Sequence, residues 1–201
     1  MGIELNKGDS INIEKSDGSI VNRLCVGVNW GSIETKGMLG GIKNIPVDLD
    51  ASCISYNAEH KLIELVYYGK LNVPGIKHTG DDIFGDVDGD QGIDNEVLII
   101  DTEKLSVETD QIVFVLNSFQ KQTFKDLPSA SIRLYEGTAK QVDNILATYD
   151  VVNDPKFSGS TSLVLGKMTR QKDGWSFKAI GEITDDSKLE DTAKTVKQNY
   201  L

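Results

Sequence analysis

Seven carboxylates lie within seventeen residues of this chain, in a stretch that contains no lysine or arginine. The stretch reads GDDIFGDVDGDQGIDNE, and its acidic residues are Asp81, Asp82, Asp86, Asp88, Asp90, Asp94 and Glu96. Two such charges about 5 Å apart repel each other by roughly 3 kcal/mol at an effective dielectric constant near 20. A folded loop of this composition therefore needs a bound cation, or it must stay open to solvent.

The ligand atoms that this stretch offers are oxygens, which favours a hard cation such as calcium or magnesium over zinc or copper. Calcium fits better, because it accepts about six to eight oxygens in irregular geometry whereas magnesium keeps its waters. The spacing of Asp86, Asp88 and Asp90 resembles the opening of an EF-hand loop, but Gly89 comes two positions too early and a strand-like run follows. We interpret the stretch as a calcium-binding loop of another kind, with a solvated acidic turn as the alternative.

A second acidic pair stands in VDLDAS, where Asp48 and Asp50 share one face of a predicted strand because side chains in a strand alternate with a period of two. Aspartates at alternate positions usually mark a solvent-facing side, and that alternative stays open. Together the two segments offer nine carboxylates, more than one calcium ion coordinates. We therefore expect two calcium ions that share some of these ligands.

The rest of the chain consists of short apolar runs separated by glycine, asparagine, aspartate and serine, which is typical of strands and turns. With 201 residues and 39% hydrophobic content, the chain is expected to form one domain over residues 1–201. We predict an all-β fold, a two-sheet β-sandwich of about ten strands. The predicted strands are residues 10–15, 23–30, 49–56, 61–68, 96–101, 111–117, 131–137, 145–152, 162–170 and 175–182.

One helix is expected to close the chain within residues 185–201. Ser187 and Glu190 have the spacing of a capping box, which predicts where the helix begins. Apolar residues follow at helical spacing, at Leu189, Ala193, Val196 and Tyr200. Such a stripe usually faces a core, so we expect the helix to pack on the sandwich. Residues 118–127 are expected to form a second short helix or a structured loop.

Charge and composition exclude several kinds of partner. The formal net charge is -10, and a field of this sign repels nucleic acid and anionic membranes. The longest apolar runs, such as residues 112–116, are too short to span a bilayer, so we expect no direct membrane insertion. Cys25 and Cys53 lie in strand-like apolar stretches and are expected to be buried free thiols, which indicates a reducing compartment. The start of the chain has no signal region, and we expect a cytoplasmic protein.

A metal-dependent hydrolase that uses the acidic loop is the alternative function. The aromatic content of 7% is low for a cleft that stacks sugars, and the chain lacks a nucleophile elbow, a P-loop and a metalloprotease HExxH motif. His60 and His78 are far apart in the sequence, and calcium disfavours imidazole, so we expect structural roles for both. We favour a protein without catalytic activity. A purely structural interaction module remains a third possibility.

The motifs in this order resemble the TerD family of tellurium-resistance and bacterial stress proteins. The resemblance covers nearly the whole chain, through LNKGDSINI, VGVNWG, VDLDAS, HTGDD, GDVDGD, DNE, IVFVLN, SIRLYEG and WSFKAIGE. It implies a β-sandwich that binds calcium through its acidic loops, with no established catalytic activity. It also makes other stress-response proteins the candidate partners.

The resemblance further implies which residues are ligands. Asp48 with Asp50 would be one pair, and Asp81 with Asp82 a second. The family's acidic run would be matched by Asp88, Asp90, Asp94 and Glu96. Residues 91–93 interrupt that run, so the ligand roles of Asp90 and Asp94 stay open. The stretch YYGKLN also lacks the paired asparagines usual in the family.

Overall fold

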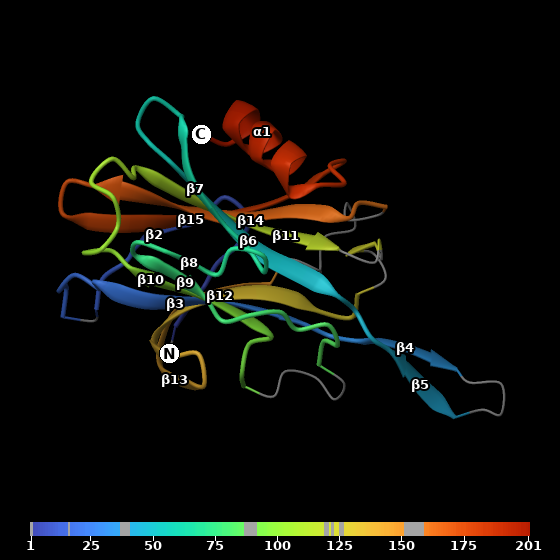
Figure 1. Ribbon diagram of the computed structural model, residues 1–201. Helices are drawn as coiled ribbons and strands as arrows, with labels where there is room; N and C mark the ends of the chain where they lie inside the picture. The colour runs from blue at the N-terminus through green and yellow to red at the C-terminus, as the bar shows by residue number, and fades with distance from the viewer. Residues whose placement is uncertain are drawn as a thin grey trace.

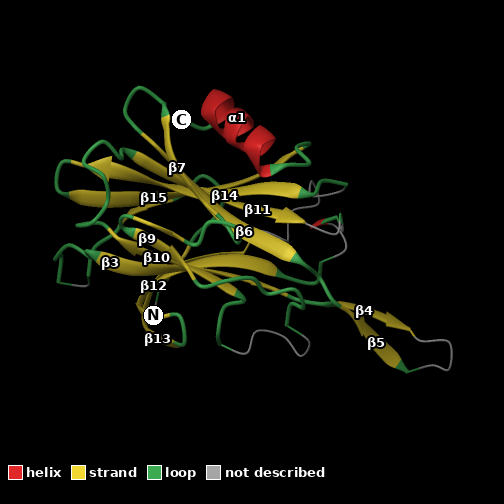
Figure 2. Cartoon of the chain, in the orientation of Figure 1, coloured by secondary structure: helices red, strands yellow, loops and turns green. Residues whose placement is uncertain are grey.

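Two sheets packed face to face, with one helix on an outer face, make up most of the molecule (Figure 1). The computed structural model describes residues 2–15, 17–36, 41–86, 92–118, 121, 123–124, 127–150 and 159–201. Figure 2 shows how strands dominate and how the helix stands alone at one side of the sandwich. The predicted all-β sandwich with a C-terminal helix is confirmed.

The first sheet has seven strands and the second has six. In spatial order, the seven-stranded sheet contains β1 (Ile3–Glu4), β13 (Gln141–Asp150), β12 (Ala130–Thr138), β3 (Arg23–Trp30), β10 (Glu96–Asp101), β9 (Ile76–His78) and β8 (Asn72–Val73). The six-stranded sheet contains β2 (Ser10–Asn12), β15 (Gly174–Thr184), β14 (Ser162–Gln171), β11 (Gln111–Ser118), β6 (Leu49–Tyr56) and β7 (Leu62–Val66). A separate hairpin of β4 (Ile33–Lys36) and β5 (Ile42–Ile45) projects from one end (Figure 1).

The predicted strands match the observed ones closely. β3, β6 and β10 have the bounds that the sequence predicts, and the other predicted strands differ at their ends. The final residues of one predicted strand, 151–152, lie outside the described residues. Five strands were not predicted, namely β1, β4, β5, β8 and β9, and each has only two to four residues. Segments this short carry too few side chains to show a period.

Alternate side chains of β6 face opposite sides of the six-stranded sheet. Leu49, Ala51 and Cys53 enter the core between the two sheets, whereas Ile54 and Tyr56 belong to a second cluster on the outer face. Its neighbour β11 and the strand β10 are each hydrogen-bonded on both sides, as their apolar character on both faces predicts. Cys25 and Cys53 are buried free thiols, as expected.

The helix α1 (Leu189–Asn199) covers the outer face of the six-stranded sheet. Its Ala193 and Val196 pack in the same cluster as Ile54 and Tyr56, and the Tyr56 hydroxyl donates to the carbonyl oxygen of Ala193 at 2.8 Å. The predicted capping box is wrong, because Lys188 is the N-cap residue and no side chain caps the helix.

The start of α1 is fixed instead by contact with the sheet. Thr192 is fully buried, and its hydroxyl lies 3.2 Å from Ser162 Oγ and 3.3 Å from Asn117 Nδ2. This contact fixes which side of the helix faces the sheet. In this orientation the N-cap residue is Lys188 and not Ser187. The predicted short helix or loop at residues 118–127 lies partly outside the described residues.

Candidate metal centre

Three aspartates from two distant segments meet at the start of β6. Asp48 precedes the strand, Asp50 lies on it, and Asp81 lies in the loop after β9. One carboxylate oxygen from each lies within 4.8 Å of the others. Asp48 and Asp50 are buried, with 7% and 8% of their surface exposed, and Asp81 is exposed. Among the described residues, this is the cluster whose oxygens are placed to hold a metal ion.

The environment of Asp50 disfavours its negative charge. Its pKa is raised from 3.8 to about 7. Burial is the largest cause, and the charges of Glu96, Asp48 and Asp81 add to it, while His78 acts in the opposite direction. A cation among these oxygens would replace repulsion by attraction. The cluster therefore fits a dication with a preference for oxygen ligands.

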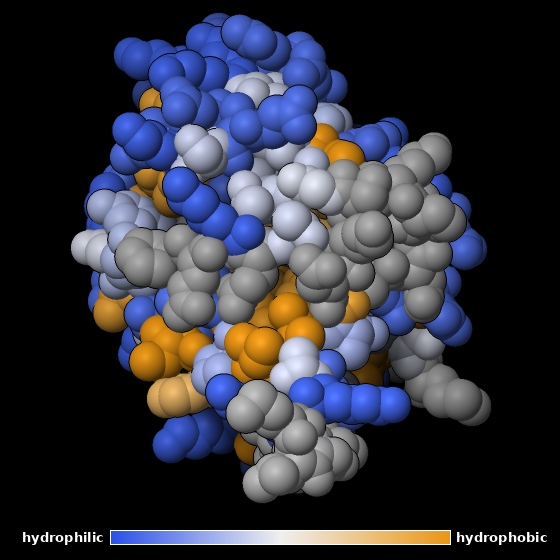
Figure 3. All heavy atoms as spheres, turned by 90° about the vertical axis from the view of Figure 1, so that its right-hand side faces the viewer, coloured by the Kyte–Doolittle hydropathy of each residue, from blue (hydrophilic) through white to orange (hydrophobic). Residues whose placement is uncertain are grey.

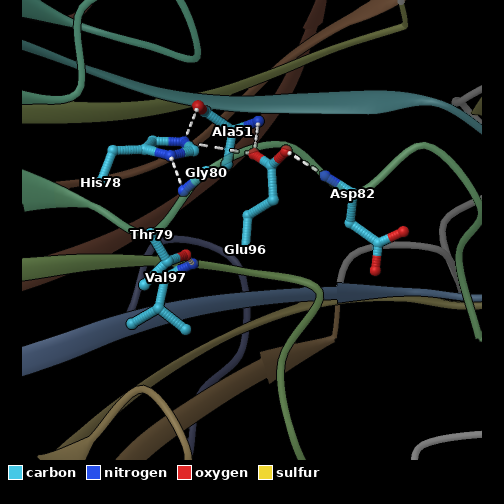
Figure 4. Close-up of polar contacts among 7 residues, drawn as sticks. All are labelled: Ala51, His78, Thr79, Gly80, Asp82, Glu96 and Val97. Atoms are coloured by element: carbon cyan, nitrogen blue, oxygen red, sulfur yellow. Dashed lines mark hydrogen bonds and ion pairs between the residues drawn. The ribbon is translucent and has the colours of Figure 1, made fainter.

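A buried pair, His78 on β9 and Glu96 on β10, joins the acidic loop to β6 (Figure 4). Gly80 N–H donates to His78 Nδ1 at 3.0 Å, so the proton of a neutral ring lies on Nε2. Nε2 lies 2.9 Å from the carbonyl oxygen of Ala51 and 3.3 Å from Glu96 Oε2. The two carboxylate oxygens of Glu96 accept hydrogen bonds from Ala51 N–H at 2.8 Å and Asp82 N–H at 3.1 Å.

Glu96 and His78 each influence the other's ionisation. Burial raises the pKa of the Glu96 carboxyl, although the hydrogen bond and charge of His78 act against this rise. Burial also lowers the pKa of His78, but the hydrogen bond and charge of Glu96 outweigh it, so the pKa of His78 is raised. Glu96 thus holds the start of the acidic loop against β6 through bonds that use both of its oxygens. The structural role expected for His78 agrees with these contacts.

The next residues of the HTGDD motif continue this attachment. Thr79 pairs with Val97, donating its N–H to the Val97 carbonyl at 3.0 Å and accepting from Val97 N–H through its hydroxyl at 2.9 Å (Figure 4). Gly80 has a φ of +119°, in the region that favours glycine. The chain turns at this glycine and brings Asp81 to Asp48 and Asp50.

Two further predicted ligands form hydrogen bonds within the loop and, for Asp86, also to β3. Asp82 Oδ1 accepts from Phe84 N–H at 2.9 Å, and Asp82 Oδ2 accepts from Asn95 Nδ2 at 3.1 Å. Asp86 accepts from Asn29 Nδ2 at 2.8 Å and from Asn95 Nδ2 at 3.3 Å. These bonds use neutral donors, so they fix the shape of the loop and leave its net charge unchanged.

Asp94 belongs to a different face of the molecule. Its Oδ1 lies 2.7 Å from Arg133 Nε, and the side chain of Asp94 is fully buried. It lies over Gly27 of β3, where an added Cβ atom would overlap the Asp94 carboxylate. The neighbouring Cys25 packs with Tyr135 on the outer face of the seven-stranded sheet. The structure therefore does not bring Asp94 to the three clustered aspartates.

Sequence reasoning gave no role to several residues that position the centre. Trp30 is fully buried, and its Nε1–H donates to the carbonyl oxygen of Val47 at 2.9 Å, next to Asp48. Trp30 N–H donates to Asn95 Oδ1 at 2.7 Å. Gly85 has a φ of +69°, and an added Cβ atom would come within 2.9 Å of the Trp30 ring. The hydrogen bond from Trp30 to Val47 joins the motif VGVNWG to the motif VDLDAS, so neither motif alone predicts it.

Exposed apolar side chains lie in the same loop as these acidic residues. Ile83, Phe84 and Ile93 expose 45%, 61% and 52% of their surface. Apolar side chains also gather below the centre of the face shown in Figure 3, with hydrophilic residues covering its upper part. The loop is thus amphipathic as well as acidic.

Comparison with known proteins identifies the family. A family model described as the TerD domain matches residues 1–195. The chain belongs to the TerD family. Tellurium resistance protein TerZ of Serratia marcescens is 29% identical over 183 residues, which cover 89% of each chain. Stress response protein SCP2 of Bacillus subtilis is 30% identical, covering 95% of this chain and 97% of that protein. The resemblance found in the sequence is confirmed.

A solved structure supports the TerD fold. The crystal structure of a homologue of the telluride resistance protein TerD from Streptomyces coelicolor superimposes with a TM-score of 0.63. The match covers 86% of this chain and 95% of that one, at 19% identity, and it shows the fold alone. In the part of this TerD-family chain that the structure describes, no helix is long and apolar enough to cross a membrane.

The predicted ligands of this TerD-family chain thus fall into three groups. Asp48, Asp50 and Asp81 form the cluster. A second group forms hydrogen bonds or an ion pair with other residues outside the cluster, namely Asp82, Asp86, Asp94 and Glu96. Asp88 and Asp90 lie outside the described residues.

Proposed function

We propose that the protein is a calcium-binding, non-catalytic stress-response protein of the cytoplasm that acts as a binding or scaffold module. The observation that carries the proposal is the convergence of Asp48, Asp50 and Asp81, with Asp50 buried among like charges. A set of carboxylate oxygens suits calcium, which tolerates irregular coordination. The relatives named for tellurium resistance and stress response support the biological assignment.

The two halves of the centre contribute differently to ion binding. Asp50 lies on β6, where it pairs with Asn117 of β11, so its backbone is held in place before any ion arrives. Asp81 lies in a loop that pairs with β6 through Glu96 and His78. Ordering a loop residue costs roughly 1–2 kcal/mol, so the strand lowers the entropic cost of binding. The second of the two proposed ions would draw on Asp88 and Asp90.

Calorimetry on the chelator-treated full-length chain tests the metal assignment. We expect calcium to bind more tightly than magnesium, and Asp50→Asn to lose calcium binding at the cluster. Asp101→Asn is the matched control, because Asp101 is an aspartate on β10 that pairs with Lys104 outside the cluster. Magnesium binding as tight as calcium binding, or no heat from either metal, would contradict the assignment.

Two further measurements test the absence of catalysis and the role as a module. If the chain is instead a hydrolase, the metal-loaded protein should turn over phosphoester or glycoside substrates, and Asp50→Asn should abolish that turnover. If it is a module, other stress-response proteins should copurify with it in calcium and dissociate in chelator. If the same proteins copurify in calcium and in chelator, the scaffold role does not depend on the ion.

A further inference from the structure

A cavity of about 410 Å³ lies beside the candidate metal centre, lined by residues of the six-stranded sheet and of the first turn of α1. Figure 1 shows α1 beside this sheet. Asp50 and Ser52 of β6 and Asn117 of β11 line the side formed by the sheet. Asn117 is directly opposite Asp50 in the pairing of the two strands. Cavities of roughly 300–1,000 Å³ are typical of small-molecule sites. Asp50 thus belongs both to the aspartate cluster and to this cavity.

Buried polar atoms without partners line this cavity. Ser52 is 1% exposed, and its hydroxyl makes no hydrogen bond to any described residue. Asn117 donates its Nδ2 hydrogens to Ser162 Oγ at 2.9 Å and Thr192 Oγ1 at 3.3 Å, which leaves Oδ1 without a partner within the described chain. A buried polar group without a hydrogen-bond partner destabilises the folded chain. A ligand that bonds to Ser52 and Asn117 would offset that destabilisation.

Positive groups line the side formed by the helix. Among the described residues no side chain caps α1. Asp191 N–H donates to the Lys188 carbonyl at 3.0 Å, so the N–H groups of Leu189 and Glu190, which carry partial positive charge, are the ones that would bind an anion. Lys188 and Lys121 line the same cavity, in a chain whose net charge is -10. Glu190 and Asp50 oppose them. An anion placed here would be repelled by Asp50 unless a cation occupied the aspartate cluster.

The remaining wall is aromatic. Tyr67 and Tyr68 line the cavity and contact each other edge to face, with ring centroids 5.4 Å apart. Ser118 adds a second serine hydroxyl without a partner among the described residues. The donors are therefore spread over two lysines, a helix terminus and hydroxyls, which matches the three oxygens of a phosphate better than the two of a carboxylate.

We propose that this cavity binds a small phosphomonoester that carries hydroxyl groups, with its phosphate at the first turn of α1 and a hydroxyl at Asn117 Oδ1. Ser52 donates to the ligand from the floor of the cavity. Calcium at the aspartate cluster strengthens this binding by neutralising Asp50, and by linkage the ligand strengthens calcium binding by the same factor. The coupling rests on the proposed function, whereas the cavity does not.

Glycerol 2-phosphate is the probe, titrated into the full-length chain with and without saturating calcium. Calorimetry gives the affinity, and amide NMR shifts of Leu189 and Glu190 report the position of the phosphate. Glycerol and glycerate, which carry no phosphate, are the matched probes. We expect glycerol 2-phosphate to bind more tightly than either, to bind more tightly in calcium, and to shift both amides.

Variants separate this site from adventitious binding. Ser52→Ala and Lys188→Gln should each weaken glycerol 2-phosphate binding about tenfold, in line with the loss of one bond to a charged group. The control for Ser52 is Ser32→Ala, because Ser32 is 4% exposed, its hydroxyl has no hydrogen-bond partner among the described residues, and it does not line the cavity. The control for Lys188 is Lys197→Gln in the last turn of α1. Both controls should bind as the unaltered chain does.

Each outcome decides one part of the proposal. No binding of glycerol 2-phosphate, or equal binding in Ser52→Ala and Lys188→Gln, overturns the site even if calcium binds. Tighter binding of glycerate overturns the choice of a phosphomonoester. Phosphate binding that calcium does not change supports the cavity and overturns the coupling. A separate titration with calcium alone decides the proposed function, so the failure of one is distinguishable from the failure of the other.

Discussion

Replacing Asp50 by asparagine removes a buried charge while keeping the shape of the side chain. The folded chain holds the Asp50 proton with a pKa of about 7, against 3.8 for an ordinary aspartate. Because the folded-state value is raised, protonated Asp50 adds stability that is fully present below pH 3.8 and is lost as the pH rises to about 7. One pKa unit corresponds to about 1.4 kcal/mol. The whole effect is therefore on the order of 4 kcal/mol.

Thermal unfolding in the presence of chelator measures this loss. Between about pH 5 and about pH 8 the titration of Asp50 covers two pKa units, or about 2.7 kcal/mol. For a chain of this size, that corresponds to a Tm change of about 5–10 °C. The unaltered chain should fall by this amount relative to Asp50→Asn as the pH rises. Saturating calcium should remove the difference in the unaltered chain, since the ion takes the place of the proton.

Asp101→Asn is the control for this measurement. Asp101→Asn should follow the unaltered chain over this range, because the hydrogen bond from Lys104 lowers the pKa of Asp101. If the unaltered chain and Asp50→Asn melt in parallel at both pH values, Asp50 ionises without penalty. The like-charge argument for a cation at this cluster would then fail.

Two predictions concern predicted ligands that lie outside the aspartate cluster. Gly27→Ala should destabilise the fold by about 3 kcal/mol, because the new methyl group must displace Asp94 from Arg133. Gly41→Ala, whose methyl group meets no described atom within 4 Å, should be near neutral, and equal melting of the two variants would contradict this packing. Glu96→Gln should cost about 1–3 kcal/mol in chelator, since an amide cannot accept at both positions, while the exposed Glu108→Gln should be silent; unchanged melting would show that the two bonds carry no stability.

The strands could be predicted where the sequence carried a continuous, largely apolar run. β3, β6 and β10 are such runs of eight, eight and six residues, and almost all of their residues are buried. The hairpin of β4 and β5 was missed because each strand has only four residues and the two form a separate two-stranded sheet. Pairing of such short segments is decided by backbone hydrogen bonds, which leave little trace in composition.

The candidate ligands could be predicted as a group but not as individuals. Asp94 and Glu96 are two positions apart on the same stretch, yet Asp94 pairs with Arg133 on one face and Glu96 with His78 on the other. Strand alternation would place residues two apart on the same face, but β10 begins only at Glu96, and Asp94 lies in the irregular segment before it. Their partners lie far away in the sequence, and a local pattern cannot identify them. The cluster at Asp50 depended in the same way on a turn at Gly80.

Glu96 also changes the ionisation of the aspartate cluster that it helps to position. Glu96 fixes the loop to β6 by accepting N–H groups from Ala51 and Asp82, and these neutral donors leave its charge in place. That charge is the second cause, after burial, of the raised pKa of Asp50. A neutral residue that accepted the same two hydrogen bonds would hold the loop in the same shape. The pKa of Asp50 would then be raised less, and a cation would relieve less repulsion at Asp50. Glu96 would therefore favour the proposed ion through its negative charge while both of its oxygens bond to the backbone.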